Sequence, residues 1–424
     1  MNRMFYKLSF LAFLALFLGA CQNTGYNKEL FKKSVEKFDA AVEKVPYSQN
    51  ASLRFLSVAK DIKTFPDNEQ SLEKYCSQGL PKRHGHITHW FDENAEILQL
   101  ADETLKFEVY LLNYESLENE KRQDILNRLG RLWLSEALLY EVKEDLSGTL
   151  SSLKKVYRYS YLLTQDAFVD DFYLAWNFHR NADYIMQRVL PKLDEQELKY
   201  LLVFFEEHSR GIGSLKHYLM RKKQIAPILI QKYLKPKVED SFLDRYSLAS
   251  HNKLQNEVEE VLESQVNILS LDSHELFEND NWKSTRELLN EKIESSVFHR
   301  YFFGMRINNV TSFQRIHYYR SIMVMNNELR QFQVAWILLK KSIMASEITL
   351  DRIKEKIDSE HKNMKSKMRQ MAFIDIFSGK DYGFRIEKYH TLIWSLGPDL
   401  KDTDGLFPWD AEKGKGDIIL KLKH

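Results

Sequence analysis

Five aspartates crowd one stretch near the C-terminal end of the sequence, amid glycine and proline residues that let a loop fold back. They are Asp399, Asp402, Asp404, Asp410 and Asp417. Calcium takes about six to eight oxygen ligands on a flexible frame, so this acidic loop is a candidate structural calcium site. The alternative is a solvated loop, because aspartate, glycine and proline are ordinary turn residues and nearby lysines would neutralise the charge.

Three histidines lie between residues 84 and 89, and imidazole is a good ligand for zinc or copper. They are His84, His86 and His89, with Cys76 a short distance upstream. The competing interpretation is an exposed loop between helices with no metal. Cys76 is expected to be a small buried side chain, because no base or helix amino end is evident that would activate its thiol.

The N-terminal segment has the order of a secretory signal: a positive start, an apolar core and an exit of small residues. Arg3 and Lys7 precede the apolar run of residues 8–18, which is shorter than the ~20 residues of a comfortable membrane span. The residues that close this run are Leu18, Gly19, Ala20 and Cys21.

These four residues resemble the lipobox of bacterial lipoproteins. The resemblance implies cleavage before Cys21 and acylation of that cysteine, including a fatty acyl chain such as palmitate, which anchors the mature chain to a membrane. Residues 1–20 would be the signal peptide and residues 21–28 a tether. Gln22 follows the cysteine, and by the enterobacterial sorting rule a residue other than Asp there implies the outer membrane. The alternatives are an uncleaved anchor or a plain secretory signal.

Charge and cysteine content limit the partners and the fold. The chain carries 61 basic and 60 acidic residues, and loss of residues 1–20 would remove two basic residues and no acid. A body so close to neutrality has no general attraction for nucleic acid. With Cys21 acylated, Cys76 has no intrachain partner, so the fold must depend on its hydrophobic core and not on disulfides.

From residue 29 to about residue 370 the apolar residues recur with helical spacing, and strand-like alternation is scarce. Asp145 precedes one amphipathic stretch, Asp194 and Glu197 have the spacing of a capping box, and the longest run covers residues 312–344. This pattern predicts a mainly α fold, an irregular stack of antiparallel helices. Residues 133–161 have the shape of one tetratricopeptide-like pair, but no regular period extends over the remaining segments.

After about residue 371 the composition favours strands. Residues 382–386 and 391–396 read as a β-hairpin, and residues 417–422 as a closing strand. We therefore expect residues 371–424 to form a small antiparallel β-module appended to a helical body at residues 29–370. The acidic loop would connect the second and third strands.

The tail resembles the C-terminal β-module of the major pseudopilins of type II secretion. The resemblance rests on residues 375–380, on residues 394–399 with the sequence Trp-Ser-Leu-Gly-Pro-Asp, and on the Asp-rich loop that ends in Asp417 and Ile418. The layout is similar to that of uncharacterised envelope proteins of planctomycete and verrucomicrobial type, which place such a tail after a helical body. The pseudopilin resemblance implies a calcium ion in the acidic loop. The lipobox and Leu400 depart from the pseudopilin pattern.

The function expected from these features is that of a lipid-anchored protein of the cell envelope, facing the periplasm or the cell surface, that binds or scaffolds an envelope protein partner. No phosphate-binding glycine loop, serine elbow or zincin motif indicates a catalytic residue. One alternative is an envelope hydrolase that acts on glycan or peptide. A second is an accessory of a secretion or pilus-like machine. A deep pocket with converging Asp, Glu or His side chains would favour the hydrolase, and an apolar groove would favour binding.

Overall fold

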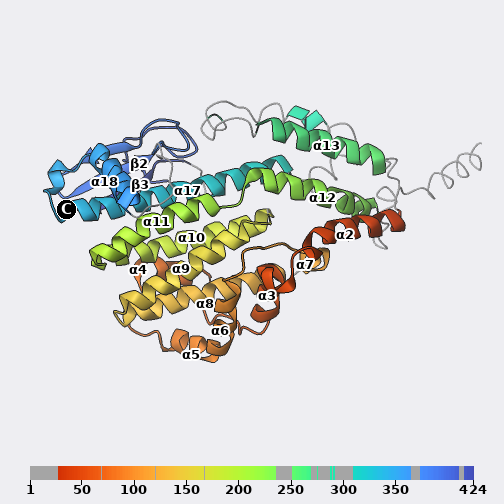
Figure 1. Cartoon of the computed structure of the whole chain (residues 1–424), viewed down its shortest axis with the longest axis horizontal. Helices are drawn as coiled ribbons and strands as arrows, with labels where there is room; N and C mark the ends of the chain where they lie inside the picture. The colour runs from red at the N-terminus through yellow and green to blue at the C-terminus, as the bar shows by residue number, and fades with distance from the viewer. Residues whose placement is uncertain are drawn as a thin grey trace, which may run out of the picture. The chain divides into compact units, whose positions relative to one another are not determined.

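The computed structural model is mainly helical, with a small three-stranded antiparallel sheet near the C-terminus (Figure 1). It describes these residues: 27–67, 69–119, 121–166, 168–234, 251–268, 275, 287–288, 290–291, 309–363, 373–409 and 415–424. The lipobox and Asp410 lie outside them. The mainly α fold with a C-terminal antiparallel sheet confirms the fold class predicted from the sequence.

The chain divides into two compact units. The larger unit consists of Val45–Tyr218, Leu271–Asn281 and Phe313–His424, and the smaller unit of Met1–Lys44, Leu219–Ser270 and Trp282–Ser312. The residues of the β-module therefore belong to the same unit as most of the helices.

The helices of the larger unit are short at its beginning and longer from Arg122 onward. Their bounds are η1 (Tyr47–Gln49), α3 (Ala51–Ala59), α4 (Glu69–Gln78), α5 (Gly85–Glu93), α6 (Ala95–Thr104), α7 (Tyr114–Glu118), α8 (Arg122–Val142), α9 (Leu146–Leu163), α10 (Val169–Val189), η2 (Leu190–Lys192), α11 (Glu195–Gly211), η4 (Ala345–Glu347) and α18 (Leu350–Asn363). Helix α17 (Asn309–Lys340) lies in this unit from Phe313 onward.

Side-chain caps begin two helices, and the sequence predicts one of them, the capping box of Asp194 and Glu197. The Oδ1 atom of Asp145 accepts a hydrogen bond from the N–H of Gly148 at 2.8 Å, at the start of α9. Asp194 and Glu197 form a reciprocal capping box at the start of α11, with distances of 2.8 and 3.1 Å. Such caps satisfy N–H groups that have no partner within the helix.

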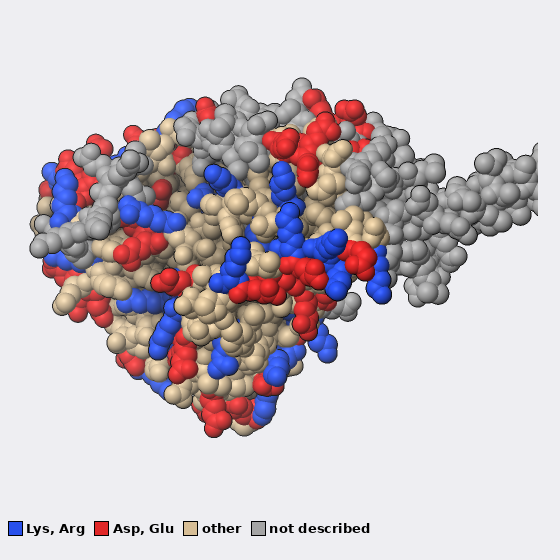
Figure 2. Space-filling view, turned by 45° about the vertical axis from the view of Figure 1, so that its right-hand side comes forward, with Lys and Arg blue, Asp and Glu red and all other residues tan. Residues whose placement is uncertain are grey.

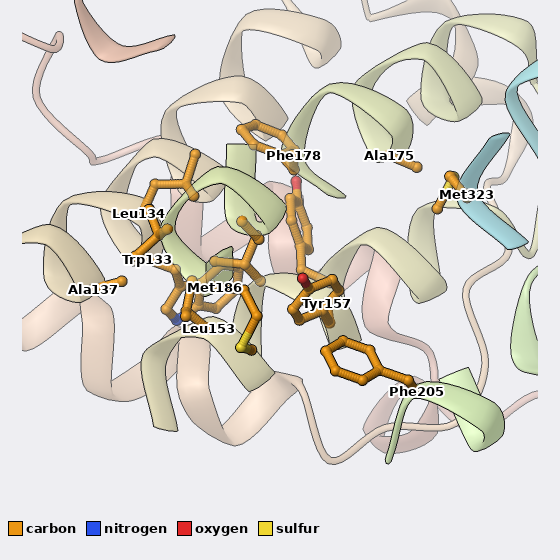
Figure 3. Packing of buried hydrophobic residues seen from close by; sticks show 14 of the residues in the cluster. Trp133, Leu134, Ala137, Leu153, Tyr157, Ala175, Phe178, Met186, Phe205 and Met323 are labelled. Atoms are coloured by element: carbon orange, nitrogen blue, oxygen red, sulfur yellow. The ribbon is translucent and has the colours of Figure 1, made fainter. Parts of the chain in front are cut away.

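Helices α8, α9 and α10 run side by side and bury the centre of the core between them (Figures 1 and 3). Trp133 of α8 and Tyr159 of α9 are fully buried, with ring centroids 5.0 Å apart. Phe55 of α3 packs edge-on against Tyr159 at 5.1 Å. The Nε1–H group of Trp133 donates to Asp102 at 2.7 Å, which satisfies the polar end of this large side chain.

The sheet of the larger unit has the order β1–β2–β3, with both pairs antiparallel. The strands are β1 (Gly383–Ile386), β2 (His390–Ser395) and β3 (Ile418–Lys423). The hairpin and the closing strand predicted from the sequence are therefore present. Strand β2 is central and almost wholly buried, whereas β3 alternates buried leucines with exposed lysines.

Asp375 holds the turns of the β-module together through one buried carboxylate. Its Oδ1 accepts hydrogen bonds from the hydroxyl of Ser395 at 2.6 Å and the N–H of Phe377 at 3.2 Å. Its Oδ2 accepts from the hydroxyl of Ser378 at 2.8 Å and the N–H of Leu396 at 3.2 Å. A buried carboxylate needs such partners. Several residues of the pseudopilin-like pattern thus have a structural role in this chain.

An aromatic contact and a buried hydrogen bond join the module to α17. Phe332 packs against Phe373 and Tyr382, with ring centroids 5.3 and 5.0 Å apart. The hydroxyl of Tyr382 donates to the carboxylate of Glu328, which is 7% exposed.

The smaller unit contains α2 (Lys28–Glu43), most of α12 (Leu215–Leu234) and α13 (His251–Ile268). The N–H of Asn27 donates to Gln231 at 2.6 Å, and the guanidinium of Arg221 lies 4.1 Å from the ring centroid of Phe38. Pro227 stands inside α12, where it removes one backbone hydrogen bond. No helix in the described part of the chain is long and apolar enough to cross a membrane.

Candidate functional site

Three aspartates of the acidic loop, Asp399, Asp402 and Asp417, accept hydrogen bonds from the loop's own backbone, whereas the Asp404 side chain is exposed. Asp399 accepts from the N–H of Gly416 at 3.1 Å. Asp402 accepts from the N–H of Asp404 at 2.8 Å and from the indole Nε1–H of Trp394 at 3.1 Å. These are turn-stabilising contacts of the kind that aspartate forms without a metal.

Asp417 is the buried member of this set. Its Oδ2 accepts from the hydroxyl of Thr403 at 2.5 Å and from the N–H groups of Thr403 and Gly405 at 3.1 and 2.9 Å. Burial raises the pKa of the Asp417 carboxyl, and the hydrogen bonds to Thr403 and Gly405 oppose that shift. Its Oδ1 has no hydrogen-bond partner among the described residues.

A calcium site would need several oxygen ligands that converge on one point of the loop. Within the described residues, no three Asp, Glu, His or Cys side chains converge as ligands for a metal ion. Asp410, the fifth aspartate, lies outside the described residues. The calcium site therefore stays a prediction.

The structure places the three histidines differently from the exposed loop expected from the sequence. The predicted loop is wrong, because α5 begins at Gly85 and carries His86 and His89; the side chains of these two histidines are exposed, as predicted. His86 Nε2 lies 2.9 Å from Asp67, and His89 Nε2 lies 3.9 Å from Glu93. His84 Nδ1 contacts the carbonyl oxygen of Pro81 at 2.8 Å. The three imidazoles thus contact three different groups.

Burial of Cys76 agrees with the sequence interpretation. Its side chain is fully buried, and this burial raises the pKa of the thiol far above its usual range. A thiol that does not ionise is a poor nucleophile.

A polar cluster that the sequence did not reveal lies inside the larger unit. His179 Nδ1 lies 3.3 Å from Asp183 Oδ2, and the Tyr157 hydroxyl donates to Asp183 at 2.6 Å. Burial opposes ionisation of Asp183, yet His179, Arg330 and Tyr157 hold its pKa below the usual value. Burial, together with His179, also lowers the pKa of His208. None of these residues lines either of the two clefts described below, so this cluster serves the interior.

A cleft of about 650 Å³ opens between three elements of the larger unit. One wall is the end of α10 with η2, at Gln187, Arg188 and Pro191. The second wall is the last turns of α17 from Gln333, with Lys341 just after the helix, and the third is residues 420–424, which include the end of β3. We call this space the basic cleft.

The floor of the basic cleft is largely apolar. Trp336 and Ile337 come from α17, and Leu420 and Leu422 from β3. Trp336 is 3% exposed, and its indole Nε1–H has no acceptor among the described residues. This donor is itself buried, so it adds to the cost of the closed floor and is not a contact offered to the cleft.

Positive charge surrounds this floor. Lys340, Lys341, Lys421 and Lys423 line the cleft, and no Asp or Glu does. Lys341, Lys421 and Lys423 form no ion pair with any residue that the structure describes. Arg188 also lines the cleft but is engaged by Glu141 through two contacts of 2.7 Å. On the face shown in Figure 2, by contrast, acidic and basic side chains are interspersed. The cleft thus concentrates positive charge on a nearly neutral protein, and such a field would attract an anion.

The smaller unit has a cleft of its own, of about 580 Å³, between α2, α12 and α13. Leu30, Met220 and Pro227 give it apolar walls, and Lys33, Lys37, Lys223 and Glu259 give it mixed charge. This mixture favours no single class of ligand.

Comparison of the chain with protein-family models, with curated proteins and with solved structures found no match. The function must therefore be argued from the geometry of the chain itself.

Sequence reasoning missed the basic cleft because its walls come from three distant parts of the chain. The available signal was the alternation of leucine and lysine over residues 420–423. That pattern predicts a strand with one buried and one basic face.

Proposed function

We propose that this chain is a lipid-anchored protein of the cell envelope that binds an anionic partner in the basic cleft, in a scaffolding role and not as an enzyme. Cys21 would carry the lipid, and the larger unit would present the cleft to the partner. The lipobox-like residues support the anchor, and the cleft supports the binding role.

The observation that carries the binding role is the composition of the cleft. An apolar floor with a few placed polar groups and a charged rim is typical of a recognition site. Hydrolysis of glycan or peptide would need a carboxylate pair or another acid–base pair at the substrate, and no Asp or Glu lines this cleft.

The test is cross-linking and affinity capture of the acylated protein from its native envelope, read by mass spectrometry. We expect a recurrent partner that is lost from the double variant Lys340→Glu/Lys341→Glu. A control is Lys388→Glu, since Lys388 is an exposed lysine of the β-module that does not line the cleft.

A partner captured equally well by the double variant would contradict the assignment of the cleft. Capture of no partner, together with turnover of envelope glycan or peptide by the purified protein, would replace the binding role with the hydrolase.

A further inference from the structure

We infer that the free edge of β3 takes up an extended acidic segment of a partner protein as a fourth strand of the sheet. This inference rests on the proposed function and specifies the chemistry of the partner. The backbone of β3 at the sheet edge supports it, and this support is independent of the positive charge of the cleft.

The lining of the basic cleft includes five consecutive residues, Leu420 to His424. Side chains of a strand alternate between two faces, so a cleft above one face would touch every second residue. Contact with every residue in succession indicates that the edge of the strand, with its backbone groups, forms this wall.

The register of the sheet shows which backbone groups face that edge. The N–H of His424 donates to the carbonyl of Tyr389, which lies opposite to it, at 3.0 Å. Hydrogen-bonded and non-hydrogen-bonded positions alternate in an antiparallel pair. The backbone of Leu420 and Leu422 therefore bonds to β2, and that of Ile419, Lys421 and Lys423 faces the cleft side.

Two contacts at the ends of β3 confirm this assignment. The N–H of Asp417 donates to Phe407 at 2.9 Å and its carbonyl accepts from Trp409 at 2.7 Å, on the side away from β2. The Nζ of Lys340 donates to the carbonyl of Lys423 at 3.3 Å. Between these points β3 pairs only with β2 among the described residues.

An added strand would meet different surroundings on its two faces. Leu420 and Leu422 are buried on the face toward the helices, whereas Lys421 and Lys423 are exposed on the other. On the helix side, the incoming chain would lie near Trp336 and Ile337, with Lys340 and Lys341 at one end. The complementary segment alternates apolar and acidic residues, which is the periodicity of a strand.

Charge selects this occupant over a second copy of the chain. Two β3 edges paired antiparallel would bring lysines of one copy close to lysines of the other, for example Lys421 opposite Lys423, and like charges opposite one another destabilise a sheet. A polyanionic glycan or a lipid headgroup would use the lysines but not the backbone edge.

The first probe is a synthetic octapeptide of alternating glutamate and valine, titrated into the full-length protein while the fluorescence of tryptophan is followed. We expect saturable binding that weakens at least about tenfold in Lys340→Glu/Lys341→Glu and not in Lys388→Glu. An octapeptide of alternating lysine and valine is the control ligand and is expected not to bind.

The second measurement separates strand addition from simple charge pairing. Lys421→Pro removes the charge and the edge-facing N–H, whereas Lys421→Ala removes the charge alone and keeps the N–H. Proline is tolerated on the free side of an edge strand. We expect the proline variant to bind about tenfold more weakly than the alanine variant.

Hydrogen exchange tests the inference on the unmodified protein. A variant that fails to fold therefore cannot obscure the result. Bound peptide should slow exchange at the amides of Ile419 and Lys421, and leave Leu420 and Leu422, already bonded to β2, unchanged.

Three outcomes would overturn the inference: no binding of the acidic peptide, binding with unchanged exchange at Ile419 and Lys421, or peptide-independent dimers formed through β3. None of these would remove a partner captured from the envelope through the lysines of the cleft, so failure of the inference is distinguishable from failure of the proposed function.

Discussion

Glu328 is an acidic side chain held where its charge is poorly solvated. Burial raises its pKa to about 7, and the nearby charge of Asp375 adds to the shift, while the hydrogen bond from Tyr382 opposes it. The folded protein therefore binds this proton more tightly than the unfolded chain does. Between pH ~4.5 and ~7, the contribution of Glu328 to stability declines as the pH rises.

Replacement of Glu328 by glutamine should remove that decline. We expect the Glu328→Gln variant to be more stable than the parent at pH 8, by up to roughly 3 kcal/mol, and to differ little from it at pH 4.5. Denaturant unfolding across this pH range measures the difference. The control is Glu355→Gln, an exposed position on α18. Parallel pH profiles for parent and Glu328→Gln would contradict the prediction.

Packing between elements decides whether a helical glycine has room for a side chain, and Gly130 and Gly85 differ in this respect. A Cβ atom added at Gly130 of α8 would overlap the ring of Phe178 of α10, which is 1% exposed. At Gly85, the first residue of α5, an added Cβ would meet nothing within 4 Å. The close approach of α8 and α10 thus depends on the missing side chain at Gly130.

The two alanine variants should change stability in opposite directions. We expect Gly130→Ala to lower the free energy of unfolding by about 1–3 kcal/mol because it overpacks the core. Gly85→Ala should raise it by up to about 1 kcal/mol, since alanine restricts the unfolded chain and favours helix. Urea denaturation of both variants tests this, and a stable Gly130→Ala protein would mean that Phe178 can move aside.

A further prediction concerns calcium binding by the acidic loop. If calcium binds there, the ion should raise the melting temperature, and that increment should vanish in Asp402→Ala/Asp404→Ala. Asp402 also accepts bonds from Trp394 and from the Asp404 N–H, so the variant should be less stable even without calcium. The informative quantity is therefore the difference between melting in calcium and in chelator, and an unchanged increment would reject the site.

At the scale of the whole molecule, the lipobox-like sequence predicts where the protein resides. We expect the mature chain to begin at Cys21, to carry the mass of its acyl groups, and to sediment with membranes. The Cys21→Ser variant should lose the acyl mass and be released from the membrane fraction, because serine lacks the thiol that would carry the lipid. Membrane fractionation and intact mass spectrometry measure both effects. A Cys21→Ser protein that still sediments after a carbonate wash would favour an uncleaved anchor.

Local signals explain what could be predicted from the sequence. Asp194 and Glu197 act on residues within one helical turn, so their spacing was sufficient to predict the capping box at the start of α11. The hairpin of β1 and β2 is local as well. The longest helix was predicted at residues 312–344 and is observed at Asn309–Lys340, a difference typical of helix ends.

Long-range packing explains what could not be predicted. The polar cluster of His179 and Asp183 requires α10 to meet Tyr157 of α9 and Arg330 of α17, and no spacing within one helix reveals such a meeting. The same holds for the basic cleft, since single lysines at residues 340, 341, 421 and 423 look like ordinary solvated side chains. The loop prediction for the histidines was wrong because it rested on the polar residues of the segment. It did not take account of Ile87 and Trp90, whose side chains are buried on one side of α5.

The separation of the cleft walls along the chain has a consequence for biogenesis. One wall ends at Pro191, and another begins at Leu420, so the site is assembled only after both ends of this long interval have emerged and folded. Contacts between such distant segments require loop closure before they form, so they form slowly. If the chain is exported and binds a partner as proposed, a chain still being translocated would have some of the lysines but not the cleft, and it would not capture that partner before export is finished.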